Sequence, residues 1–153
     1  MKPLIYIGAD HAGFGLKEDV KKILHGLHYK VIDLGNKKLE PTDDYPDFSY
    51  SVAKKVASSK NSLGILTCGS AEGMAIVANK VKGIRAVVVR DINEAKFTRE
   101  HNNANVLCLS GWNLDKTKAK KILKTWLETP FSMEERHRRR VDKIRIIEGE
   151  EMK

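Results

Sequence analysis

The sequence predicts an α/β fold in which helices cover both faces of a five-stranded parallel sheet. Short apolar runs rich in strand-forming residues alternate five times with stretches of helical spacing. This alternation is typical of a parallel sheet, because neighbouring parallel strands need a crossover between them, usually a helix. The 153 residues suit one compact domain, and no low-complexity linker or internal repeat divides them.

The first part of the chain supplies two strands and two helices. The apolar run at 3–10 predicts a strand, and the apolar spacing over 16–27 predicts a helix. A second strand is expected at 29–35, followed by a polar loop rich in turn residues. A helix is expected at 45–59, with Pro46 in its first turn, where proline is tolerated.

The middle of the chain continues the alternation. Strands are expected at 63–68, 84–89 and 104–110, with a helix of about ten residues between the first two. Asp91 is an expected N-cap for the helix that leads towards His101, because a carboxylate there accepts from free N–H groups.

Two further helices are expected at the end of the chain. Residues 114–129 are amphipathic, and Pro130 stops that helix. Ser132 and Glu135 have the spacing of a capping box, which predicts that the last helix starts at Ser132.

The net charge of +8 is concentrated late in the sequence. From residue 114 onward, 12 Lys or Arg residues outnumber 8 Asp or Glu, so this last quarter carries +4 of the +8. The densest run is Arg136 to Arg145, and its positive charge attracts phosphates. It can be a solvated helix face, a nucleic-acid patch or an anionic-substrate site. Acidic residues interrupt the run and no aromatic residues alternate with it, so we expect no nucleic-acid partner.

The sequence also predicts a cytoplasmic protein without a membrane partner. No apolar run approaches the roughly 18 to 20 residues of a membrane span, and the first apolar run is too short for a secretory signal. Cys68 and Cys108 are therefore expected as free thiols in a reducing compartment.

Open α/β sheets bind ligands at the carboxyl ends of their strands, so we expect the chemistry there. The candidates are Asp10, His11, Asp43, Asp44, Tyr45, Cys68, Ser70, His101 and Asn102. Each also has a structural interpretation: Cys68 as a core residue, Asp10 and Ser70 as helix caps, and His101 as a complement to a helix dipole. Their gathering at one edge favours a site.

The stretch "CGSAEG", residues 68–73, leads from a strand into a helix. Its N–H groups and the helix dipole are expected to lower the pKa of the Cys68 thiol. The same N–H groups can hold a developing oxyanion, and a base beside an oxyanion site suits proton abstraction next to a carbonyl.

Other phosphate and cofactor motifs are absent. The turn lacks the GK[ST] ending of a Walker loop, and "GADHAG" lacks the glycine spacing of a dinucleotide fingerprint. The Cys and His residues lack zinc-ligand spacing, so neither a metal nor an organic cofactor is expected.

Five segments in order resemble the ribose-5-phosphate isomerase B family, which includes the galactose-6-phosphate isomerase subunits. They are "GADHAGFGLK", "DYPDFSYSVA", "GILTCGSAEGMAIVANKVKGIRAVV", "REHNNANVL" and "ERHRRRVDKI", and they cover nearly the whole chain. The resemblance implies a Rossmann-like three-layer sandwich that interconverts phosphorylated aldoses and ketoses through an enediolate, without a cofactor.

The resemblance also implies catalytic roles for four residues. Cys68 is the implied base that moves a proton between C1 and C2, and Ser70 assists proton transfer at the oxygens. Asp10 and His101 are the implied residues that open the sugar ring.

Further residues are implied to bind the substrate. The backbone of Gly69, Ala71 and Gly73 is expected to hold the enediolate oxygen, while Asn102 orients the sugar and Tyr45 lines the pocket.

The phosphate is expected to meet His11, Arg136 and Arg140. In the family the basic C-terminal segment, here 131–153, reaches a neighbouring subunit, which implies a dimer or tetramer with shared sites.

Three residues depart from the family pattern, in which the turn reads close to G-[ST]-G-x-G. Ala71 replaces the middle glycine, Glu72 follows it, and Trp112 stands where many relatives have a phosphate-binding arginine. Because Cys68 fits the pentose branch, ribose 5-phosphate and ribulose 5-phosphate are the expected pair. A hexose 6-phosphate of the allose or galactose type, and a module that binds sugar phosphate or nucleic acid without catalysis, remain alternatives.

Overall fold

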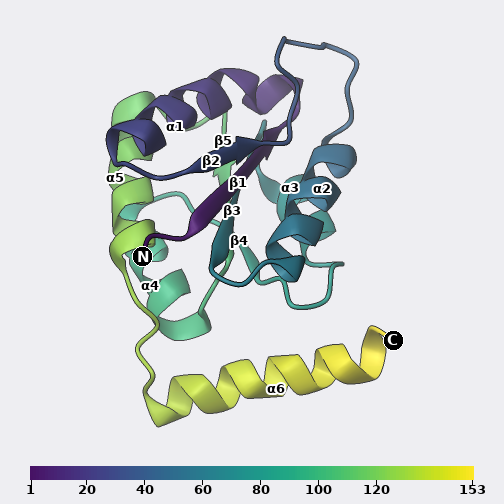
Figure 1. The fold of residues 1–153 in the computed structure, drawn as a ribbon, viewed down its shortest axis with the longest axis vertical. Coiled ribbons are helices and arrows are strands. Elements are labelled where there is room, and N and C mark those ends of the chain that lie inside the picture. The colour runs from purple at the N-terminus through teal and green to yellow at the C-terminus, as the bar shows by residue number, and fades with distance from the viewer.

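A computed structural model describes residues 1–153 and contains one parallel sheet of five strands (Figure 1). The strand order is β2-β1-β3-β5-β4, and every neighbouring pair is parallel. The α/β fold predicted from the alternation is therefore confirmed. The strands are β1 (Leu4–Ala9), β2 (Val31–Asp33), β3 (Ser62–Cys68), β4 (Ala86–Val88) and β5 (Val106–Ser110).

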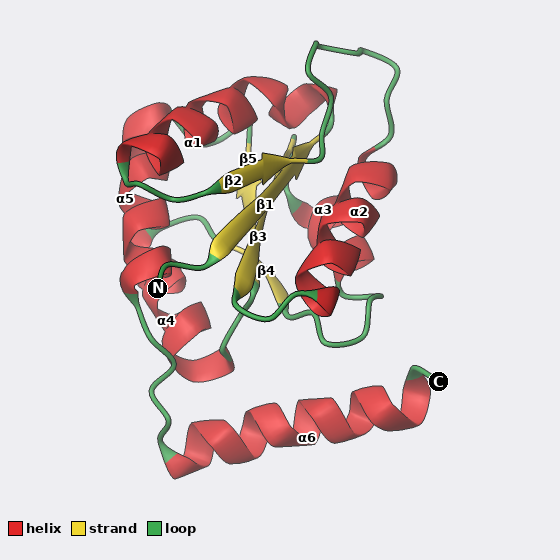
Figure 2. Cartoon of the chain, in the orientation of Figure 1, coloured by secondary structure: helices red, strands yellow, loops and turns green.

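Helices cover both faces of the sheet and make three layers (Figure 2). One face carries α1, α4 and α5, and the other carries α2 and α3. None of the helices combines the length and the apolar character that a bilayer crossing requires. The helices are α1 (Phe14–Gly26), α2 (Tyr45–Ser58), α3 (Glu72–Ala78), α4 (Ile92–Asn102), α5 (Lys116–Glu128) and α6 (Glu135–Glu151), with a short 3-10 helix, η1 (His11–Gly13), before α1.

Each face of the sheet has its own hydrophobic core. On the α1 and α5 side, Trp126 and Ile7 are completely buried, and on the α2 and α3 side, Val52 and Met74 are. Neither core includes a residue of α6. The sheet body is therefore packed without the last helix.

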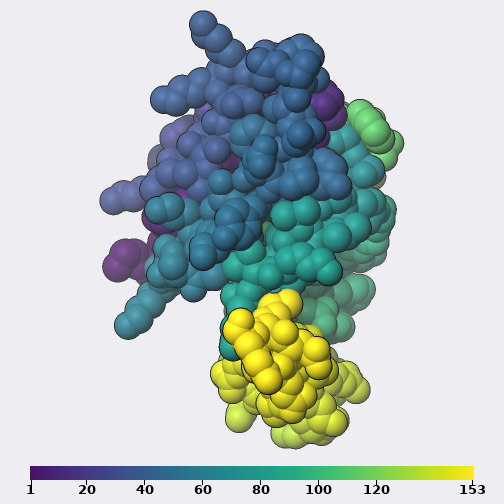
Figure 3. All heavy atoms as spheres, turned by 90° about the vertical axis from the view of Figure 1, so that its right-hand side faces the viewer, coloured from purple at the N-terminus to yellow at the C-terminus, as the bar shows by residue number.

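The last helix lies below the sheet body, as a separate lower end of the molecule (Figure 3). Only His137 and Glu148 of α6 are buried. The predicted capping box is wrong, because α6 begins at Glu135 and its N-cap is Glu134. The Ser132 hydroxyl instead lies 2.6 Å from Nδ1 of His137, so it is engaged one turn further along.

The helix after β3 has seven residues, fewer than the ten expected. Just past its end, the Asn79 side-chain amide exchanges two hydrogen bonds with the backbone of Ala86, at 2.8 and 2.9 Å. These bonds join the end of α3 to the start of β4 and stop the helix early. The expected N-cap at Asp91 is confirmed, since its carboxylate accepts from the N–H of Glu94.

Ala71, which precedes α3, has a backbone φ of 72° in the left-handed region. A residue with a Cβ loses roughly 1–2 kcal/mol there, whereas glycine loses roughly 0.5–1 kcal/mol through its freer unfolded chain. Ala71 is also completely buried, so removing its methyl group costs about 0.8 kcal/mol. The two effects oppose each other, and we expect Ala71→Gly to change the free energy of unfolding by less than about 1 kcal/mol. Urea unfolding followed by circular dichroism measures this, and a larger change in either direction would contradict it.

Candidate active site

The carboxyl ends of β1 and β3 form the switch point of the sheet, where open α/β sheets bind ligands. The two strands are neighbours, but α1 after β1 covers one face and α3 after β3 covers the other. Their register pairs Ala9 with Thr67. Asp10 and Cys68, which come next, therefore lie level with each other on strands about 5 Å apart.

Gly13 allows η1 to pack directly on the end of β3. A Cβ at Gly13 would clash with the carbonyl of Thr67, whose hydroxyl donates to the carbonyl oxygen of Gly13 at 2.8 Å. The Asp10 carboxylate accepts from the Gly13 N–H at 3.0 Å and is buried. Asp10 is thus a helix cap, and the same contact fixes its carboxylate beside the switch point.

The Cys68 thiol is buried, and its Sγ accepts from the N–H of Ala71 at 3.2 Å. Burial raises the pKa of this thiol, and the charges of Asp10 and Glu72 raise it further, while the N–H groups of Ala71 and Met74 act in the opposite direction. The expectation of a lowered pKa is therefore wrong. The N–H groups of the turn are present, but burial outweighs them.

The turn after Cys68 offers free backbone donors. The N–H groups of Gly69 and Ser70 donate to no other group of the chain. Ser70 is exposed, and its hydroxyl accepts from the N–H of Glu72 at 3.3 Å, although the N-cap residue of α3 is Ala71. The Glu72 side chain points to solvent and pairs with Arg90 at 2.6 Å.

Two aromatic rings flank this turn. A Cβ at Gly73 would lie 2.7 Å from the ring of Tyr45, and one at Gly69 would clash with the indole of Trp112. Both glycines are therefore required by close approach of a ring. Trp112 remains 72% exposed, so one side of its ring faces solvent next to the turn.

His11 is held by Asp43, a candidate at the carboxyl edge to which the sequence assigned no particular role. Its backbone N–H and its Nδ1 both lie against Oδ1 of Asp43, at 2.8 and 2.9 Å. The hydrogen bond to Asp43 raises the pKa of His11, with a smaller contribution from the charge of Asp10. The only signal for Asp43 was its position after the second strand, because 32 residues separate it from His11.

The predicted site residues fall into two groups at opposite edges of the sheet. The first group, called here the Cys68 cluster, contains Asp10, His11, Tyr45, Cys68, Gly69, Ser70, Ala71 and Gly73 at the carboxyl edge. The second, called the Arg140 cluster, contains His101, Asn102, Arg136 and Arg140 near the amino edge.

The expectation that His101 and Asn102 lie at the carboxyl edge is wrong. They end α4, which starts after β4 and runs back to the point where β5 begins. In Figure 1 the loop after β2 marks the carboxyl edge at the top, and α6 lies at the bottom. The seven residues of β3 put about 20 Å of strand between the two edges.

His101 lies between two rings in the Arg140 cluster. Its ring centroid is 5.2 Å from that of Phe97 and 4.4 Å from that of His137. Burial, followed by the charges of His101 and Arg136, lowers the pKa of His137. His137 was not among the predicted residues, and its only signal was its place in the basic run.

The two arginines of this cluster are exposed on α6. Arg136 pairs with Glu134 at 2.8 Å, whereas Arg140 makes no ion pair. They lie four residues apart, which puts them on one face of the helix. Both guanidinium groups are therefore accessible to an anion.

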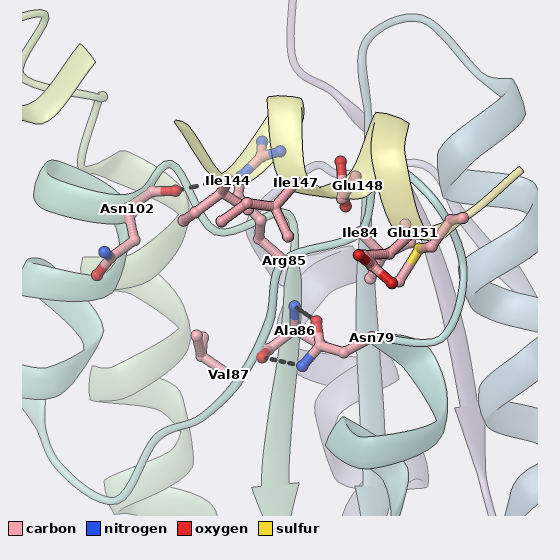
Figure 4. Close-up of a pocket in the computed structure, with 11 residues that line it drawn as sticks. Asn79, Ile84, Arg85, Ala86, Val87, Asn102, Ile144, Ile147, Glu148 and Glu151 are labelled. Atoms are coloured by element: carbon pink, nitrogen blue, oxygen red, sulfur yellow. Dashed lines mark hydrogen bonds between the residues drawn. The ribbon is translucent and has the colours of Figure 1, made fainter. Parts of the chain in front are cut away.

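A cavity of about 410 Å³ separates α6 from the start of β4. Ile144, Ile147 and Glu148 approach it from α6, and Arg85 and Asn79 approach it from the sheet body (Figure 4). Glu148 also accepts from the N–H of Gly83 at 3.1 Å. These contacts attach the last helix beneath the sheet.

The chain offers no cluster of three or more His, Cys, Asp or Glu side chains arranged to hold a metal ion. Cys108 lies fully buried within β5, as expected for a core residue. The chemistry available at the carboxyl edge is that of a buried thiol, a buried carboxylate, free N–H groups and an exposed imidazole.

Comparison with known proteins gives a consistent result. Residues 5–144 match the model of the ribose/galactose isomerase family. A protein of Mycoplasma pneumoniae named probable ribose-5-phosphate isomerase B is 44% identical over 146 residues, which cover 95% of each chain. Ribose-5-phosphate isomerase B of Mycobacterium tuberculosis is 37% identical and covers 90% of this chain and 85% of its own.

Solved structures agree with the sequence relatives. The crystal structure of ribose-5-phosphate isomerase B from Mycoplasma genitalium, with bound ribulose 5-phosphate, superposes with a TM-score of 0.91 at 42% identity. It covers 95% of this chain and 96% of its own. The type B ribose 5-phosphate isomerase of Trypanosoma cruzi superposes with a TM-score of 0.93 at 39% identity, covering 98% and 99%. On its fold, its motifs and these matches, the chain belongs to the ribose/galactose isomerase family.

Proposed function

We propose that this chain is an aldose–ketose isomerase that interconverts ribose 5-phosphate and ribulose 5-phosphate through an enediolate. The observation that carries the proposal is the buried Cys68 thiol at the switch point, beside the free N–H groups of Gly69 and Ser70. The relative from Mycoplasma genitalium, solved with ribulose 5-phosphate, supports the same pair of substrates.

The proton transfer uses Cys68 as the base. Its thiolate removes the proton from C2 of the open-chain aldose, and the electron pair forms the C1=C2 bond while negative charge moves to O1. The backbone N–H groups of the turn stabilise that oxygen. The Ser70 hydroxyl passes a proton from O2 to O1, and the Cys68 thiol returns its proton to C1, which yields the ketose.

Ring opening precedes this step. Asp10 accepts the proton of the anomeric hydroxyl, and His101 donates a proton to the ring oxygen, so the bond between C1 and that oxygen breaks. Asn102, whose side chain makes no bond within the chain, orients the sugar hydroxyls. Tyr45 closes one side of the pocket through its contact with Gly73.

A complete site requires a second copy of the chain. About 20 Å of strand lies between the Cys68 cluster and the Arg140 cluster, too far for one monosaccharide phosphate to touch both. In a two-fold dimer, the Arg140 cluster of each copy completes the Cys68 cluster of the other, so two equivalent sites form. We therefore propose one domain over 1–153, in which 131–153 carries Arg136 and Arg140 to the neighbour's substrate phosphate.

The use of a cysteine as the base indicates the cellular compartment in which the protein works. Both cysteines are free, and Cys68 must stay reduced to act as the base. We propose the reducing cytosol, where thiols persist.

The function is tested by incubating the purified protein with ribose 5-phosphate in EDTA and following ribulose 5-phosphate. Allose 6-phosphate and galactose 6-phosphate are run in parallel. Turnover is expected with the pentose phosphate at the highest kcat/KM. A higher kcat/KM with a hexose phosphate would identify that sugar as the substrate instead. Binding of all three sugar phosphates without turnover would contradict the assignment as an isomerase.

Replacing Cys68 by alanine removes the proposed base and leaves the turn in place. We expect Cys68→Ala to lower kcat by about 10²–10⁴-fold, the usual contribution of a general base. Thermal stabilisation by ribose 5-phosphate should persist. Cys108→Ala is the matched control and should keep its kcat, because Cys108 lies inside the core. Full activity in Cys68→Ala would exclude this base.

The raised pKa of Cys68 predicts how kcat depends on pH. The thiolate is the active form, and burial raises the pKa of the thiol. Below that pKa, the fraction of Cys68 present as thiolate grows about tenfold per pH unit. The bound phosphate adds negative charge and acts in the same direction. We expect kcat at saturating ribose 5-phosphate to rise steadily from pH 6 to pH 9. A flat profile over this range would argue against Cys68.

Sharing of the site predicts complementation between two inactive variants. In a homodimer of Cys68→Ala both sites lack the base, and in a homodimer of Arg140→Ala both sites lack the phosphate-binding arginine. In a mixed dimer, one of the two sites draws an intact Cys68 and an intact Arg140 from different copies. Random association should therefore restore about a quarter of the parent activity. Purification through two different affinity tags selects the mixed dimers, in which one site of two is intact, so about half of the parent activity is expected in that sample. No recovery would mean that Arg140 serves its own chain.

A further inference from the structure

Asp43 is the only carboxylate that bonds to His11, and it does so twice through one oxygen. We propose that Asp43 is a positioning residue for phosphate binding, which holds the His11 ring by Nδ1 and keeps Nε2 a hydrogen-bond donor to the substrate phosphate. This inference rests on the proposed function, because it assigns the phosphate of that substrate to His11.

The geometry determines which nitrogen carries the proton. A carboxylate only accepts hydrogen bonds, so the Nδ1 that lies 2.9 Å from Oδ1 of Asp43 must carry hydrogen. Nε2 is then the nitrogen left for a ligand. The Asp43 side chain is 8% exposed while that of His11 is 44% exposed, so the carboxylate is on the protein side and the ring is on the solvent side.

The other oxygen of Asp43 is held from behind. Nδ2 of Asn36 donates to Oδ2 of Asp43 at 3.0 Å, and the carbonyl oxygen of Asn36 accepts from Nζ of Lys17 at 2.6 Å. Lys17 is completely buried and pairs with Asp33 at 2.8 Å. The loop that carries Asp43 is therefore tied to α1 and to the end of β2.

The charge of Asp43 decides what Nε2 presents to an anion. Neutral His11 with hydrogen on Nδ1 would present a lone pair, which repels phosphate, whereas the imidazolium donates a hydrogen bond from Nε2. The bond to Asp43 and the charge of Asp10 raise the pKa of His11. The protonated form therefore persists to higher pH and is lost as pH rises through that raised pKa.

Two lysines of this network are already paired with carboxylates. Lys17 and Lys21 both bond to Asp33, and Lys21 also meets Glu18. In the proposed dimer, Arg136 and Arg140 of the second copy would approach the same phosphate and oppose protonation of His11. The negative charge of Asp43 offsets the positive charges of these two arginines at the His11 ring.

The first test titrates His11 by NMR of its ring nitrogens in the protein without ligand, so its result does not depend on any activity. Asp43→Asn keeps an oxygen beside Nδ1 and removes the charge, and we expect the pKa of His11 to fall. Asp47→Asn removes an exposed carboxylate of α2 that bonds to nothing through its side chain, and it should leave the titration unchanged. An unchanged pKa in Asp43→Asn would overturn the proposal.

The second test separates binding from chemistry. With ribose 5-phosphate at pH 8, Asp43→Asn should raise KM and leave kcat within about twofold, because loss of the Asp43 charge lowers the pKa of His11 and fewer rings then carry the charge that binds phosphate. At pH 5.5 the two KM values should lie closer together, since lower pH favours protonation of His11 in both proteins. A loss of kcat, or an equal rise of KM at both pH values, would show a structural role only.

Two controls keep the outcomes distinct. In a His11→Gln background, Asp43→Asn should add nothing to KM, because both act through one ring; additive effects would overturn the proposal. Sulfate stays dianionic across this pH range. As pH rises, inhibition by sulfate should weaken at a lower pH in Asp43→Asn than in the parent. If the parent does not turn over ribose 5-phosphate, the proposed function fails, while the NMR titration and sulfate binding still decide the role of Asp43.

Discussion

The candidate site depends on the parallel pairing of β1 with β3 at the point where the chain leaves them towards opposite faces. That pairing sets Asp10 level with Cys68. It also needs the backbone contact between Gly13 and Thr67, which admits no side chain at position 13. The loop that follows β2 then returns over η1, and Asp43 meets His11 there. These contacts place Asp10, His11 and Cys68 of the Cys68 cluster.

Strand length imposes the second constraint. The strands carry the thiol to one edge of the sheet, while α4 runs back and carries His101 to the other. No rearrangement within one copy brings these together without dismantling the sheet. The last helix adds nothing to either core and presents Arg136 and Arg140 to solvent. Its contribution to the fold is small, and its basic face is available to another copy of the chain.

The electrostatics of the two edges are complementary. The carboxyl edge carries the buried carboxylates of Asp10 and Asp43, and the other edge carries Arg140, which makes no ion pair, and Arg136, which pairs with Glu134. In the dimer proposed above, opposite charge on the two surfaces favours encounter of two copies in the correct orientation. The raised pKa of Cys68 fits this picture, because a thiolate formed there is a strong base for a weakly acidic C–H proton.

Much of the fold could be predicted from the sequence because its signals are local. The alternation of apolar runs and helical spacing predicted the strands and their covering helices, and Asp91 marked a helix start correctly. The apolar run that ends at Cys68 also identified the turn where a thiol and free N–H groups meet. Edge strands were less predictable, since β2 and β4 have three residues each and are shorter than the expected 29–35 and 84–89. Cap positions were less predictable too, since Ser132 bonds to His137 rather than starting the helix.

Only the tertiary structure decided the rest, because it depends on neighbours that are distant in sequence. The pKa of Cys68 rises since burial outweighs the N–H groups that the sequence shows beside it. Asp43 reaches His11 across a loop whose composition predicts no particular path. The edge on which His101 lies follows from the direction in which α4 returns across the sheet. The sequence by itself determined which chemical groups the chain carries, and the packing of strands determined which of them share an edge.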